Sequence, residues 1–168
     1  PVAGRHFGLS LGAGDINGDD FDELVVAQAE DGFHFYYGSL GGLPSTGSFL
    51  LTTGETSIAI GDFNGDGFDD FAMGGPFGGW TAGDGWVWEG LDRGNAAGDR
   101  FGGSLLAADL EDVGYDDLVI GAPGEDVGPE GSEFVDAGAL YVVRGSAGGL
   151  DVGGAAYWTE LNLVSQTS

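Results

Sequence analysis

The sequence predicts an all-β fold made of three copies of one unit, each with four short antiparallel strands. An acidic loop occurs three times at a spacing of 47 residues, beginning at Asp15, Asp62 and Asp109. Runs of apolar, aromatic and β-branched residues flank each loop, as is typical of strands. The chain has 36 glycines among 168 residues, which suits many tight turns. No capped amphipathic stretch is long enough to predict a helix.

Composition narrows the classes of partner. With 28 acidic and 4 basic residues the net charge is −24, so phosphates would be repelled and neither nucleic acid nor an anionic membrane is expected as a partner. Apolar residues make up 42%, enough for a folded core. There is no cysteine, and no apolar run approaches the ~20 residues that a membrane span needs. The chain begins with Pro1 and shows no signal peptide, so we expect a mature or excised piece of a longer product.

The repeats divide the chain into one module of three approximate units, 1–53, 54–97 and 98–168. In the first unit we expect strands at 9–14, 24–27, 33–37 and 49–52. In the second we expect them at 58–61, 71–73 and 86–88, with a fourth somewhere in 91–97. In the third they are expected at 105–108, 118–120, 140–143 and 156–161. Four short antiparallel strands in roughly 40–50 residues are typical of a β-propeller blade.

Short phrases around the loops resemble the FG-GAP repeat. The third unit has Phe101-Gly102 before its loop and Gly121-Ala122-Pro123 after its second strand. The first unit keeps Phe7-Gly8, and the second keeps only Gly74-Gly75-Pro76. FG-GAP repeats build the propeller of integrin α subunits and of many bacterial secreted proteins. Three blades do not close a ring, so the resemblance implies half of a six-bladed propeller or a fragment of a larger one.

The acidic loops carry oxygen-bearing side chains at alternate positions, the ligands that hard cations such as Ca²⁺ prefer. The resemblance implies that side chains at loop positions one, three, five and nine bind Ca²⁺, with the main-chain carbonyl of position seven. Position five of the third loop is Val113, so that site is expected to bind weakly, use water or stay empty. The ligands would be Asp15, Asn17, Asp19, Phe21 and Glu23 in the first loop; Asp62, Asn64, Asp66, Phe68 and Asp70 in the second; and Asp109, Glu111, Tyr115 and Asp117 in the third.

Of two other interpretations of the loops, the EF-hand fails and the metal-free turn remains open. An EF-hand needs a Glu at position twelve and helices on both sides, but position twelve is Val26, Met73 or Ile120 inside an expected strand. Alternatively, Asn, Asp and Gly favour turns without any metal.

We expect no catalytic residues. Ser10 lies in a G-x-S-x-G phrase, but a nucleophile elbow needs a helix after the Ser, and Ser57 and Ser104 recur at the same repeat position. His6 is replaced by Arg100 in the third unit, and His34 is expected on one face of a strand. Tryptophans can stack on sugar rings, and Trp80, in a glycine-rich connection, is the best candidate for an exposed ligand contact.

The expected function is non-enzymatic recognition or adhesion by an extracellular or cell-surface module. Alternating strand directions put the long acidic connection 124–137 on the face opposite the calcium loops. Integrin α subunits use that face for ligands, so the resemblance implies a protein or glycan ligand there. The other interpretation is a solvated insertion with no partner. The alternative is a propeller domain of a secreted carbohydrate-active or other hydrolytic or lyase enzyme with catalysis elsewhere. Two copies could also form a homodimer that completes a six-bladed ring.

Overall fold

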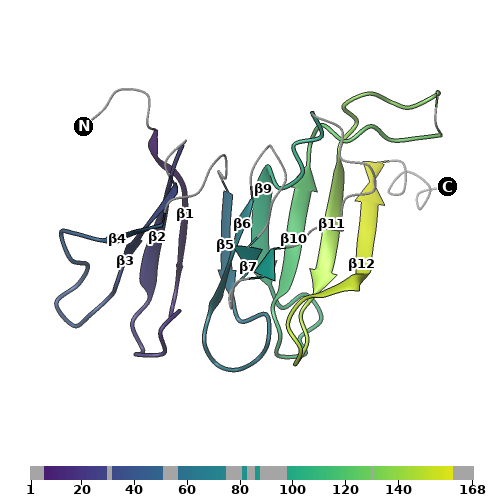
Figure 1. Ribbon diagram of the computed structural model, residues 1–168. Coiled ribbons are helices and arrows are strands. Elements are labelled where there is room, and N and C mark those ends of the chain that lie inside the picture. The colour runs from purple at the N-terminus through teal and green to yellow at the C-terminus, as the bar shows by residue number, and fades with distance from the viewer. Residues whose placement is uncertain are drawn as a thin grey trace.

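The structure is a computed structural model that describes residues 6–29, 32–50, 57–74, 81–82, 86–87, 98–129 and 131–160. The elements in these ranges are strands, arranged in three four-stranded antiparallel sheets. Each sheet uses four strands that are consecutive in the chain, and the sheets stand side by side in chain order as an open series (Figure 1). The predicted all-β fold is therefore confirmed.

The first sheet has the order β1-β2-β3-β4. Its strands are β1 (Phe7–Gly14), β2 (Glu23–Gln28), β3 (Gly32–Tyr36) and β4 (Ser48–Leu50). Gly14 pairs with Glu23 directly across the acidic loop, so the loop is the hairpin connection between β1 and β2. The prediction of four strands here is confirmed, with ends that differ by at most two residues; the expected residues 51–52 of the fourth strand lie outside the described residues.

The second sheet corrects one assignment. Its strands are β5 (Ser57–Gly61), β6 (Asp70–Gly74), β7 (Thr81–Ala82) and β8 (Trp86–Val87). Trp86 and Val87, expected in the third strand, form the fourth strand β8, because β7 pairs with both β6 and β8; residue 88 lies outside the described residues. A two-residue strand such as β7 has no side-chain periodicity that a sequence could reveal. The fourth strand expected within 91–97 lies outside the described residues.

The third sheet has the order β12-β11-β10-β9. Its strands are β9 (Ser104–Ala108), β10 (Asp117–Ala122), β11 (Ala139–Arg144) and β12 (Asp151–Thr159). β12 begins before the expected residue 156, because Gly153 and Gly154 lie inside the strand, where they carry no side chain to mark its alternation.

Alternate side chains of each strand point to opposite sides of its sheet. We call the side turned toward the next sheet along the chain the front face, and the opposite side the back face. The first core cluster joins the front face of the first sheet to the back face of the second, through Val25, Ala27, Phe33, Ile58 and Met73. The second core cluster joins the second and third sheets in the same way, and it includes Ala59, Phe63, Ala72, Phe101, Leu118, Ile120 and Tyr141.

The loops lie at two opposite ends of the sheets. The three acidic hairpins lie together at the lower end in Figure 1, and the long connection between β10 and β11 projects at the upper end. The back face of the first sheet and the front face of the third sheet are the two outer faces of the series, and no other described sheet covers them.

Candidate functional site: the acidic loops

The first two loops fold around the carboxylate at position one. In the first loop, Asp15 Oδ1 accepts the N–H groups of Gly18 at 2.7 Å and Asp19 at 3.1 Å, and its Oδ2 accepts that of Asp20 at 2.9 Å. These bonds hold the acidic side chain at the centre of its own turn. The second loop repeats them around Asp62, with Gly65, Asp66 and Gly67 as donors at 2.6, 3.2 and 2.9 Å.

The carboxylate at position nine ties the loop to its own sheet. Glu23 has no exposed surface; its Oε2 accepts the N–H groups of Ile16 and Asn17, each at 3.2 Å, and its Oε1 accepts that of Gly38 at 3.2 Å. In the third loop, buried Asp117 accepts the N–H of Gly145 at 3.0 Å. In the first and third loops, position nine therefore braces the start of the loop against the turn after the third strand.

The third loop departs from the other two. Hydrogen bonds from the N–H groups of Val113 (3.0 Å) and Gly114 (2.7 Å) to Asp109 hold the pKa of that carboxyl below its ordinary value. Glu111, a predicted ligand at position three, forms an ion pair with Arg144 at 2.6 Å. A cation here would have to compete with this arginine and would lack an oxygen at position five.

The first two loops offer only oxygen donors, as a hard cation requires. The side chains of Asn17, Asp19 and Asp66 are exposed at the loop surface, while Glu23 is buried beneath it. Among the described residues, no three carboxylates or imidazoles already converge on one point. The chemistry of these two loops thus fits Ca²⁺, and the ligand assignments in all three loops remain predictions.

Position eight of the second and third loops makes a contact with the preceding loop that the sequence analysis did not predict. Asp69 Oδ2 accepts the N–H of Asp15 at 2.8 Å, and the N–H of Asp69 donates to the carbonyl of Asp15 at 2.9 Å. Asp116 forms the same pair with Asp62, at 3.1 and 2.9 Å. We call this reciprocal pair the position-eight clasp. The signal that could have revealed it is the recurrence of Asp at position eight, a position to which the predicted metal ligands give no role.

Opposing effects act on the pKa of the Asp69 carboxyl in this clasp. Partial burial raises the pKa of Asp69, and the hydrogen bond from Asp15 opposes that rise. The negative charges of Asp116, Asp62 and Asp22 raise the pKa further. The clasp therefore holds a carboxylate in a place that its neighbours make unfavourable for negative charge.

The serine, histidine and tryptophan considered in the sequence as possible catalytic or ligand contacts can now be located in the fold, where they are described. The phrase around Ser10 runs through strand β1, so it does not form the strand–turn–helix of a nucleophile elbow. His34 packs edge-on against the ring of Phe7, with 5.2 Å between ring centroids, and its Nε2 lies 3.3 Å from Gln28 Oε1. Trp80 lies outside the described residues.

Comparison with known proteins agrees with the repeat seen in the structure. No curated protein matches the chain in a sequence search. Within the described residues, no helix is both long and apolar enough to cross a membrane. Residues 15–73 match the model of a family described as the FG-GAP-like repeat, a stretch that contains the first two acidic loops. The chain therefore contains an FG-GAP-like repeat, as the sequence resemblance predicted.

Proposed function

We propose that this chain is a calcium-binding FG-GAP β-propeller module that recognises a protein or glycan ligand outside the cell or at its surface, without catalysis of its own. The FG-GAP-like match and three sheets packed face to face in chain order support the propeller-type architecture. The two open outer faces leave room for further blades.

In this proposal the first two loops hold one Ca²⁺ each. Their oxygen-only donor sets support this assignment, and so does the position-one carboxylate, which the loop amides hold in place. The third loop binds Ca²⁺ more weakly, because the Val113 side chain supplies no oxygen and Glu111 already forms an ion pair with Arg144. The metal's role is structural: it offsets the repulsion among carboxylates gathered in each turn.

The observation that carries the recognition role is the hairpin between β10 and β11, described for residues 125–129 and 131–138. Paired bonds between Val127 and Phe134, at 3.1 and 2.8 Å, close it. Its base is braced by the N–H of Asp136, which donates to Asp126 Oδ1 at 2.8 Å. The side chains of Phe134 and Val135 are nevertheless 61% and 73% exposed. A hydrogen-bonded loop that holds adjacent apolar side chains in water is typical of a binding surface.

A binding screen followed by paired variants tests this role. The wild-type chain, in excess calcium, would be screened against immobilised glycans and extracellular proteins. The double variant Phe134→Ser, Val135→Ser should weaken the best hit by about tenfold or more, since exposed aromatic anchors dominate such interfaces. The control Leu40→Ser removes a side chain that is 94% exposed in the β3–β4 connection, and it should leave binding unchanged.

Two results would contradict the proposal. Equal loss of binding in the hairpin variant and in the Leu40 control would show non-specific apolar adhesion. Release of reducing sugar ends from a polysaccharide by the isolated chain would instead identify an enzyme.

A further inference from the structure

Each position-eight clasp joins a predicted calcium ligand of one loop to the loop that follows. The main-chain N–H and carbonyl of Asp15, at position one of the first loop, both bond to Asp69 of the second loop, at 2.8 and 2.9 Å. Asp116 of the third loop holds Asp62 of the second loop in the same way, at 3.1 and 2.9 Å. The two residues of each clasp are 54 positions apart in the chain, so the contact joins separate repeats.

The clasp completes the support of the position-one residue. The carboxylates of Asp15 and Asp62 are held by amides of their own loops. Those bonds fix the side chain, whereas the clasp fixes the peptide groups on both sides of it. A carboxylate held in both ways loses less conformational freedom when it binds a metal ion. Removing groups that orient metal ligands typically weakens metal binding by about 10–100-fold.

Position eight also lies between two further predicted ligands of its own loop. In the second loop, Asp69 stands between Phe68, whose carbonyl is the expected ligand at position seven, and Asp70 at position nine. A second loop that is ordered by its own ligands therefore holds Asp69 where it can bond to Asp15. Order in one loop is in this way passed to the position-one ligand of the loop before it.

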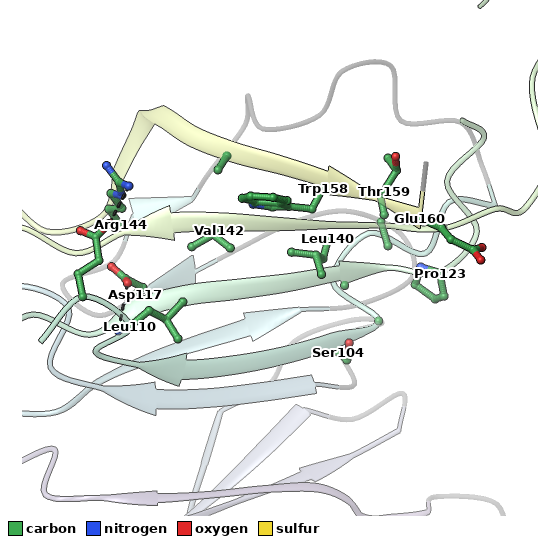
Figure 2. A pocket seen from close by; sticks show the side chains of 17 residues that line it. Ser104, Leu110, Asp117, Pro123, Leu140, Val142, Arg144, Trp158, Thr159 and Glu160 are labelled. Atoms are coloured by element: carbon green, nitrogen blue, oxygen red, sulfur yellow. Dashed lines mark hydrogen bonds and ion pairs between the residues drawn. The ribbon is translucent and has the colours of Figure 1, made fainter. Parts of the chain in front are cut away.

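The third loop forms its clasp although its own metal site is incomplete. Val113 supplies no side-chain oxygen at position five, and Glu111 forms an ion pair with Arg144. Arg144 and the position-nine residue Asp117 lie together at the loop end of an open cavity on the third sheet (Figure 2). A positive charge therefore already stands beside this loop. The clasp to the second loop is formed all the same, so the third loop retains the contact that serves its neighbour.

We propose that Asp69 and Asp116 are positioning residues for the calcium sites of the preceding loops, so that the second loop supports the first site and the third loop supports the second. The third loop then serves calcium binding through Asp116 rather than through a strong site of its own. This inference rests on the calcium role proposed above. It adds that each site is complete only when the following loop is folded against it.

Calcium titrations that resolve the two loops by nuclear magnetic resonance test this proposal. In the isotope-labelled chain, the amide signals of Gly18 and Gly65 report on the first and second loops, and a chain of 17.1 kDa is small enough for such spectra. Titration at buffered free calcium concentrations then gives a separate Kd for each loop.

The decisive comparison is between two substitutions at the same position. Asp69→Ala and Asp69→Asn remove the same negative charge, but only asparagine keeps an oxygen that can accept the N–H of Asp15. The first loop should therefore bind calcium about tenfold or more weakly in Asp69→Ala than in Asp69→Asn. The second loop should bind calcium equally in both variants, because there only the lost charge matters. Asp116→Ala and Asp116→Asn should show the same difference at the second loop.

Asp22 provides the matched control. It occupies position eight of the first loop and is exposed, and no acidic loop precedes it in residues 1–14. Asp22→Ala and Asp22→Asn should therefore give equal calcium affinities in both loops. A difference as large as that at Asp69 would show that alanine merely loosens the loop that carries it. Circular dichroism would confirm that each variant is folded, and the two clasps can be tested separately if one alanine variant is not.

Three further outcomes would overturn the proposal. Equal first-loop affinities for Asp69→Ala and Asp69→Asn would show that the clasp does not position the ligand. A loss in Asp69→Ala that is confined to the second loop would show that position eight acts only within its own loop. A wild-type chain that binds no calcium at either loop would instead contradict the calcium role itself, and this inference with it.

Discussion

At the scale of single residues, Asp69 joins two sheets although its surroundings disfavour its charge. Its pKa is raised above the ordinary value of 3.8, first by partial burial. A carboxyl whose folded pKa is raised binds its proton more tightly in the folded state. Its contribution to stability is fully present below pH 3.8 and is lost as the pH rises through the folded pKa. At neutral pH the negative charge of Asp69 thus opposes folding, while its hydrogen bonds to Asp15 favour it.

Substitutions at Asp69 separate these two effects. In chelator at pH 7, Asp69→Asn should be as stable as wild type or more so, because it keeps an acceptor oxygen and loses the charge. Asp69→Ala should lose about 1–2 kcal/mol of unfolding free energy, since Asp15 keeps an unpaired N–H. Urea denaturation between pH 4 and 7 should also show a weaker loss of stability with rising pH for Asp69→Asn than for wild type. Equal destabilisation of both variants would contradict this account.

At the scale of elements, the two Phe-Gly phrases differ in whether their phenylalanine packs against a preceding sheet. Phe101 precedes β9 and is buried against the second sheet, while Phe7 begins β1 and has no preceding sheet to contact in the described structure. Phe101→Ala should therefore lower the unfolding free energy by about 3–5 kcal/mol, as for other buried aromatic side chains. Phe7→Ala should cost less than about 1 kcal/mol, as for an exposed side chain. Denaturant titration of both variants checks this, and similar costs would mean that the phrase stabilises its own sheet instead.

The elements nearest the acidic loops were the most predictable from sequence. The loops fix the register of the hairpins, and the apolar runs beside them, such as those at β5 and β6, are too short for helices and are bounded by glycine and turn residues, as is typical of strands. β7 was missed because two residues carry no pattern. The metal interpretation gave roles to positions one, three, five, seven and nine, so the repeated Asp22, Asp69 and Asp116 received none. The contact of Arg144 with Glu111 joins residues far apart in the chain, and nothing local indicates it.

At the scale of the whole molecule, the acidic loops of three sheets share one end of a chain with a net charge of −24. The charges that raise the pKa of Asp69 come from all three loops, which shows that the loops repel one another as well as themselves. Two bound Ca²⁺ ions would carry four positive charges and reduce the net charge to −20. Because they would sit in the loops, they would act where the repulsion is concentrated.

Chelation should therefore lower the Tm of the entire chain in one transition. A ligand that binds only the folded state at about 100 times its Kd stabilises it by about 2.7 kcal/mol per site. Calorimetric titration should show two strong sites, with the third weaker or absent. NaCl at matched ionic strength should recover only part of the loss, since it screens exposed charges without bridging them, and Mg²⁺ should recover less than Ca²⁺ because it demands a tighter octahedral shell. If chelator leaves the Tm unchanged and calcium releases no heat, hydrogen bonds to the loop amides alone hold these turns.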